Sequence, residues 1–148
     1  MSLKERIQDD MKAAMRARDS ARLSAIRLLL AAIKQREVDE RVEQDDAAVL
    51  ATVEKLVKQR RDAATQYDAA NRPELAASER FEIEVLTAYL PAALSEQALD
   101  EVISMALAEC GARTPGDMGK VMALLKPRLA GRADMADVSR RVRARLSA

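Results

Sequence analysis

The chain has 148 residues, a length that suits one domain or a larger unit with a small appendage. Hydrophobic residues make up 49% of it and aromatic residues only 2%, while glycine and proline occur four times each. Histidine is absent and cysteine occurs once, which excludes the usual general base, an intrachain disulfide and a thiolate metal cluster. The abundance of strong helix formers predicts an all-α fold. No metal or cofactor is expected.

Four helices are predicted in the first 90 residues, which form a long helical N-terminal domain. Ser2-Leu3-Lys4-Glu5 is a capping box that opens the first helix. Asp19-Ser20 caps a second helix that runs to about residue 43, and Asp45-Asp46 caps a third. Pro73 suits the first turn of a fourth helix, which ends before Pro91. These helices are long and highly charged, which favours an extended hairpin.

A small three-helix domain is predicted over residues 94–148, after a boundary at Leu90-Pro91-Ala92-Ala93-Leu94. Proline inside a helix removes a hydrogen bond and clashes with the preceding turn, so the middle helix should kink or end near Pro127. Capping residues, glycines and prolines mark the helix boundaries: Ser95, Gly111, Thr114-Pro115, Pro127, Gly131 and Asp134.

The charges are unevenly distributed along the chain. Residues 111–148 hold nine Lys and Arg against three Asp, a net charge of +6, whereas the remainder carries −5. Such a basic tail suits an anionic partner such as a nucleic acid. The tail could equally lie against the acidic body of the same chain, and charge alone does not separate these interpretations.

Gly119-Lys120 differs from a phosphate-binding Walker loop, because only two residues separate Gly116 from Gly119 and Val121 follows the lysine. Glycine inside a helix costs about 1 kcal/mol relative to alanine. Two explanations stay open for Gly119: it permits close approach of another helix, or it opens the backbone to a ligand.

Gly131-Arg132-Ala133-Asp134 predicts a helix end, a turn and a new N-cap, from which Arg132 projects. Basic residues around Arg132 could neutralise phosphates of a nucleic acid. No aromatic residues lie among them for stacking on bases. A solvated basic face is the alternative. The candidate RNA-contacting residues are Gly119, Lys120, Gly131, Arg132, Arg140, Arg141 and Arg143.

Two carboxylates, Glu79 and Glu82, fall on the apolar stripe of the fourth predicted helix. Paired carboxylates can perform acid–base chemistry, but an ion pair that fixes helix register is the commoner reason. Arg27, between Leu23 and Leu30 on its helical face, is the predicted partner. An acidic run around the end of the second helix is expected to be a solvated hairpin tip: Asp39, Glu40, Glu43, Asp45 and Asp46.

Several spaced motifs occur in an order that resembles the GatB/YqeY family, specifically the stand-alone YqeY-like proteins. They are Arg22-Leu23-Ser24, Arg27-Leu28-Leu29, Lys58-Gln59-Arg60, Glu79 with Glu82, Tyr89-Leu90-Pro91, Asp117-Met118-Gly119-Lys120-Val121-Met122 and Gly131-Arg132-Ala133-Asp134. The tail resembles the C-terminal domain of the B subunit of the tRNA-dependent amidotransferase. The resemblance implies a helical domain followed by a three-helix, tRNA-contacting domain.

The catalytic core and the glutaminase of that amidotransferase have no counterpart here, so the family label of carbon–nitrogen ligase with glutamine as amido-N-donor is not expected to describe this chain alone. We expect a non-catalytic module associated with tRNA. The alternatives are a protein-interaction adaptor that uses the helical hairpin, and an accessory to glutamine-dependent amidotransferase activity.

Membrane association is not expected, since no apolar run approaches the roughly 20 residues that a bilayer requires. The first predicted helix is too charged for a signal peptide. The sequence therefore predicts a soluble, cytoplasmic protein.

Overall fold

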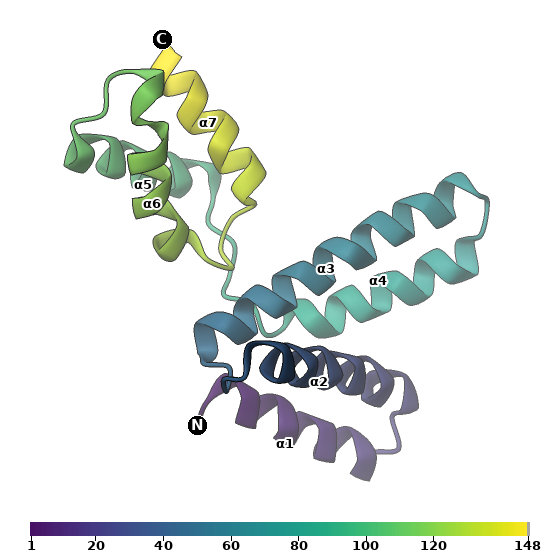
Figure 1. Cartoon of the computed structure of the whole chain (residues 1–148). Helices are drawn as coiled ribbons and strands as arrows, with labels where there is room; N and C mark the ends of the chain where they lie inside the picture. The colour runs from purple at the N-terminus through teal and green to yellow at the C-terminus, as the bar shows by residue number, and fades with distance from the viewer. Residues whose placement is uncertain (148) are drawn as a thin grey trace. The chain divides into compact units, whose positions relative to one another are not determined.

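The computed structural model describes residues 1–147, in which all regular structure is helical (Figure 1). The all-α prediction is confirmed. The elements are α1 (Leu3–Arg16), α2 (Ser20–Glu40), α3 (Asp46–Ala69), α4 (Pro73–Thr87), α5 (Glu96–Cys110), the short 3-10 turn η1 (Pro115–Asp117), α6 (Met118–Leu129) and α7 (Met135–Ser147). Contacts divide the chain into two compact units, Met1–Leu90 and Pro91–Ala148.

In the first unit, α1 packs against α2, and α3 and α4 lie side by side as a long antiparallel pair (Figure 1). Local capping fixes the helix starts. The Ser2 hydroxyl accepts from the Glu5 amide while the Glu5 carboxylate accepts from the Ser2 amide, at 3.1 and 3.0 Å. The Asp45 carboxylate accepts from the Ala48 amide at 2.9 Å. These bonds satisfy amides that the first turn of a helix leaves without partners.

The apolar core of this unit draws on all four helices. Its buried members are Ile7, Ala14, Ala25, Ile26, Leu29, Ile33, Val49, Val53, Val57, Val85, Leu86 and Tyr89. The Tyr89 hydroxyl donates to Asp10 Oδ2 at 2.6 Å, and the Arg6 guanidinium lies 5.2 Å from the ring centroid. Burial, followed by this bond to Asp10, raises the pKa of Tyr89 above its ordinary value. The segment that follows α4 is thereby held against α1.

The predicted ion pair is corrected by the structure. Glu82 pairs with Arg60 of α3, with Arg60 Nε 2.8 Å from the carboxylate, and Arg27 is exposed. The reason is the rotation of α2: Ala25, Ile26, Leu29 and Ile33 are buried, whereas Leu23 and Leu30 are only partly buried. This rotation turns Arg27 away from the core. Glu79 is half-buried and has no ion pair within residues 1–147.

The predicted acidic tip, which spans the end of α2 and the turn that follows it, is more structured than expected. Glu40 accepts from Arg36 Nε at 3.1 Å, and Asp46 Oδ1 accepts from the Leu3 amide at 2.9 Å. Glu43 lies 3.7 Å from Lys4 Nζ. Most of these carboxylates therefore join α1 to the turn between α2 and α3 or cap a helix, and do not form a purely solvated surface.

The second unit contains α5, η1, α6 and α7. Gly111 ends α5 with a φ of +63°, and Gly131 follows α6 with a φ of +75°, both in the left-handed region that favours glycine. α6 ends at Leu129, two residues beyond Pro127. Apolar residues from all three helices form the core: Leu99, Ile103, Ala106, Val121, Leu125, Leu129, Val138, Val142 and Leu146.

Candidate nucleic-acid interface

The turn between α6 and α7 presents Arg132 on a backbone that is held from both sides. The Arg132 amide donates to the Leu129 carbonyl at 2.9 Å, and the Leu94 amide donates to the Arg132 carbonyl at 3.1 Å. Asp134 Oδ1 accepts from the Ala136 amide at 3.0 Å, as expected of an N-cap of α7. The Arg132 side chain itself is exposed. A fixed turn therefore carries a cation that faces solvent.

Gly119 and Lys120 lie in the first turn of α6 and both are exposed. A Cβ added to Gly119 would meet no atom within 4 Å apart from its own helix and chain neighbours. Close approach of another helix within the described residues is therefore not the reason for this glycine. The space beside Gly119 is open on this side of the helix.

The loop before α6 is organised by Asp117. Its carboxylate accepts from the Arg113 amide at 2.9 Å and from the Thr114 amide at 3.2 Å. These two bonds, in that order, are the main reasons why the pKa of Asp117 lies below its ordinary value. The Asp117 side chain thus stabilises the loop through hydrogen bonds to its backbone. Lys120 follows about one helical turn later.

Arg141 is held within the unit by three carboxylates. Its guanidinium lies 3.0 Å from Asp137, 3.1 Å from Asp100 and 3.6 Å from Glu96. The bond to Asp137 is the largest cause of the raised pKa of Arg141. This arginine therefore joins α7 to α5, and its charge is balanced internally.

The other predicted arginines of α7 differ from one another. Arg140 is paired with Asp137 at 3.1 Å, although most of its side chain remains exposed. Arg143 is exposed and forms no ion pair with residues 1–147. In that part of the chain, the exposed cations of the second unit without an ion pair or side-chain hydrogen bond are Arg113, Lys120, Lys126, Arg132 and Arg143.

Sequence reasoning missed the role of α5. This helix carries Glu96, Asp100, Glu101 and Glu109 and no basic residue. Glu109 pairs with Arg128 at 2.6 Å, and Glu96 and Asp100 receive Arg141. An all-acidic helix that precedes a basic segment is a signal that could have indicated these pairs. Their formation reduces the number of arginines left to face a partner.

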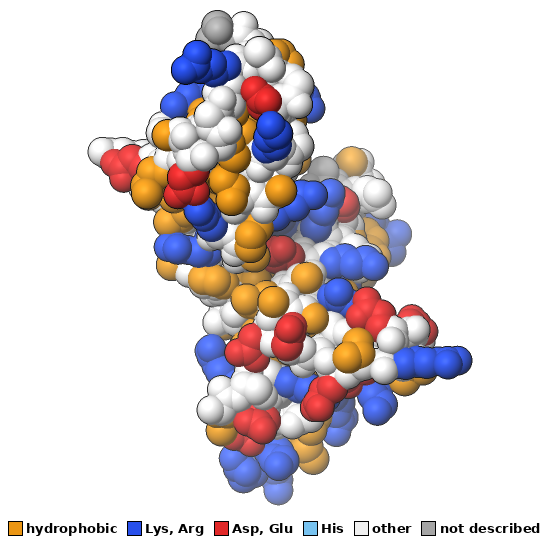
Figure 2. Space-filling view, turned by 60° about the vertical axis from the view of Figure 1, so that its left-hand side comes forward, with side chains coloured by type: hydrophobic (Ala, Val, Ile, Leu, Met, Phe, Trp, Pro, Cys, Tyr) orange, Lys and Arg blue, Asp and Glu red, His pale blue; other side chains and the backbone are white. Residues whose placement is uncertain are grey.

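The visible face of the second unit, in the upper part of Figure 2, shows basic side chains separated by acidic and apolar ones. In residues 1–147, no helix is both long and apolar enough to cross a membrane. No group of three or more Cys, Asp or Glu side chains in that range could hold a metal ion. The candidate interface consists of exposed cations on α6, on α7 and in their loops.

Comparison with protein families matches a model described as Yqey-like protein over residues 4–146. Among curated proteins, "Altered inheritance of mitochondria protein 41, mitochondrial" of Lachancea thermotolerans is 35% identical over 113 residues, covering 74% of this chain and 60% of the relative. The protein of that name from Pyrenophora tritici-repentis is 30% identical over 129 residues, covering 83% and 71%. The one from Saccharomyces cerevisiae is 32% identical over 85 residues, covering 57% and 46%.

The chain spans less than two thirds of the length of the Lachancea and Saccharomyces relatives. The relatives carry the word mitochondrial in their names. That finding contradicts the expectation of a cytoplasmic protein, which rested only on the absence of a recognisable signal peptide or membrane-spanning run.

Proposed function

The chain belongs to the Yqey-like protein family, and we propose that it acts as a non-catalytic helical module that binds RNA of the tRNA class through its second unit. The observation that supports this proposal is the set of exposed cations on the second unit that have no ion pair among the described residues: Arg113, Lys120, Lys126, Arg132 and Arg143. Phosphate neutralisation by such cations dominates the affinity of proteins for nucleic acids.

The carboxylates of the same unit support the proposal because most are already engaged. Asp117 and Asp134 accept backbone amides, Asp137 and Asp100 bind Arg141, and Glu109 binds Arg128. These negative charges are thus balanced locally or used in caps, and repel an incoming phosphate less than free carboxylates do.

The absence of aromatic residues from residues 91–148 suggests which features of RNA the unit would read. Stacking on bases requires aromatic or guanidinium planes, and sequence-specific contact usually targets unstacked bases. Contact through Lys and Arg alone favours the phosphate backbone and the shape of an A-form helix. Structured tRNA presents both features.

Binding of purified protein to unfractionated tRNA across a salt series tests the proposal. In the double variant Lys120→Gln/Arg132→Gln, affinity should fall, and the slope of log K against log salt should become shallower by about 2, roughly one for each lost phosphate contact. The double variant Lys12→Gln/Lys55→Gln removes two exposed cations from the first unit and serves as the control. Equal effects of the two double variants, or no binding by the unmodified chain at low salt, would reject the proposal.

A second candidate function is a protein-interaction adaptor that uses the first unit. The observation that favours it is a set of exposed apolar side chains on α2, on α4 and in the turn after α2: Leu28, Val38, Val42 and Phe81. Val38 and Val42 of this set line one hollow. Exposed apolar side chains that lie together are characteristic of protein-binding surfaces, whereas isolated ones are ordinary.

A further inference from the structure

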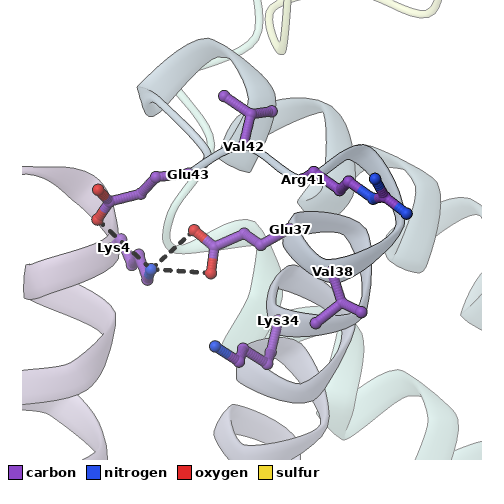
Figure 3. A pocket seen from close by; sticks show the side chains of 7 residues that line it. All are labelled: Lys4, Lys34, Glu37, Val38, Arg41, Val42 and Glu43. Carbon is purple, nitrogen blue, oxygen red and sulfur yellow. Dashed lines mark hydrogen bonds and ion pairs between the residues drawn. The ribbon is translucent and has the colours of Figure 1, made fainter.

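A hollow of about 390 Å³ lies where the end of α2 and the turn that follows it face the first turn of α1 (Figure 3). The residues that line it are Lys4, Lys34, Glu37, Val38, Arg41, Val42 and Glu43. Val38 and Val42 are 58% and 56% exposed, although valine usually lies in a core. The hollow thus combines two uncovered aliphatic side chains with charged groups.

Lys4 organises one side of the hollow (Figure 3). Its Nζ lies 2.8 Å from Glu37 Oε2 and 3.7 Å from Glu43 Oε1. The Glu37 carboxylate, whose side chain is only 10% exposed, also accepts from the Gln44 amide at 2.9 Å. Lys4 and Glu37 therefore neutralise each other's charge and form a structural part of the wall of the hollow.

Lys34 and Arg41 are different, because both are exposed and neither forms an ion pair with any residue of the described chain, 1–147. They lie on the lining beside Val38 and Val42. A partner that covers the two valines would bring its own charges next to these two cations. The complementary partner is therefore apolar at its centre and acidic at its edges.

The backbone of Arg41 is a second feature of this rim. Arg41 ends α2 with φ +55° and ψ +37°, and its amide and that of Val42 both donate to the Glu37 carbonyl. Glycine adopts this left-handed conformation at lower cost than arginine. The chain nevertheless places a guanidinium here, beside the exposed valines.

We infer that this hollow docks a partner protein, through a segment that carries carboxylates beside aliphatic side chains. The inference rests on the adaptor candidate and identifies its surface and the chemistry of its partner. Aliphatic side chains of the segment cover Val38 and Val42, while its carboxylates pair with Lys34 and Arg41. RNA is the poorer occupant, because phosphates pair with Lys34 and Arg41 but leave Val38 and Val42 uncovered.

The test uses the ¹⁵N-labelled chain of 148 residues and a synthetic amphipathic peptide with leucines on one helical face and glutamates on its flanks. Amide signals of residues 34–43 should shift on titration, and a peptide with lysines in place of the glutamates should shift them far less. Arg41→Gly should lower the affinity for the acidic peptide about three- to tenfold, since it removes one positive charge from the rim of the hollow.

Arg18→Gly is the matched control. Arg18 is also exposed and has a left-handed backbone with φ 56°, but lies at the end of α1 and not on the hollow. Arg18→Gly relieves the same kind of backbone strain and removes the same charge as Arg41→Gly. Because Arg18 lies away from the hollow, the affinity for the peptide should stay as in the unmodified chain. Glycine relieves the backbone at both positions, so neither variant is expected to unfold.

Each other outcome has a defined meaning. Shifts confined to α3 and α4 would reject the hollow and leave the adaptor candidate standing. No shifts anywhere at millimolar peptide would reject both. Equal binding of the lysine peptide, or equal weakening by Arg18→Gly, would show that the hollow does not select an acidic partner. Stronger shifts of residues 34–43 with tRNA would assign the surface to nucleic acid.

Discussion

Arg141 and Arg143 lie two positions apart on α7, which turns their side chains about 200° apart around the helix axis. Arg141 faces the carboxylates of Glu96, Asp100 and Asp137, and only 27% of its side chain is exposed. Arg143 faces solvent. The same residue type therefore stabilises the unit at one position and is free for a ligand at the other.

Alanine substitution at these two positions should separate the two roles. Arg143→Ala should weaken tRNA binding and reduce the salt slope by about 1, with unfolding unchanged. Arg141→Ala should lower the midpoint of urea unfolding, because it leaves three carboxylates around an empty position, and should change the salt slope much less. Anisotropy titrations and urea melts of both variants measure this, and the reverse pattern would contradict the assignment.

At the scale of the elements, α1, α2 and the turn before α3 meet through polar groups at one end of the first unit. Lys4 of α1 binds Glu37 of α2, and Glu37 also binds the amide of Gln44. Gln44 Nε2 donates to Glu40 at 2.9 Å, while Gln44 Oε1 is buried without a partner among the described residues. A polar junction of this kind is sensitive to the charge of its carboxylates.

Acid should weaken this junction. Two hydrogen bonds hold the pKa of Glu37 below its ordinary value of 4.5. The bond from Lys4 has the larger effect and the bond from the Gln44 amide the smaller one. A carboxylate with a lowered folded-state pKa contributes stability that is fully present above its unfolded pKa and is lost as pH falls through the folded one. Stability measured by urea unfolding should therefore decrease below about pH 4.5.

Glu37→Gln should lower stability at pH 7 and make the decrease toward pH 3 smaller than in the unmodified chain. Asp39→Asn is the control, since Asp39 is exposed and, within residues 1–147, accepts only from Gln35 at 2.9 Å. An unchanged acid dependence in Glu37→Gln would show that other carboxylates govern it.

At the scale of the whole molecule, the two units have separate cores. Each core is closed by contacts within its own unit, and the chain passes between the units at Leu90-Pro91. A unit of about 60 residues buries only about 60% of its unfolded surface and is correspondingly marginal. The second unit should therefore fold by itself but with low stability.

Separate production of residues 1–90 and 91–148 tests this. Both fragments should show helical circular dichroism, and 91–148 should melt at the lower temperature. Its tRNA affinity should stay within about twofold of that of the full chain, because phosphate contacts dominate such binding. Binding by residues 1–90 alone would move the RNA interface to the first unit.

Local chemistry was enough for much of the fold. The Ser2-Glu5 capping box, the caps Asp45, Ser95 and Asp134 and the helix end at Gly111 occur where the sequence predicts them. A cap depends on hydrogen bonds between residues two or three positions apart, so the sequence contains all that is required. The Yqey-like family was also identified from spaced motifs alone, and the family comparison confirms it.

The candidate site depended more on tertiary structure. The sequence identified Lys120 and Arg132 as candidates but could not separate Arg141 from Arg143, because that distinction requires the carboxylates of α5 to lie beside α7. It also chose Arg27 instead of Arg60 as the partner of Glu82, since the rotation of α2 is set by packing and not by spacing. Most helix starts were thus determined by sequence, through short-range hydrogen bonds, whereas α2 ends at Glu40 and not near residue 43, and a 3-10 turn at Pro115–Asp117 precedes α6. Which charges are paired and which remain free was decided only when distant helices came into contact.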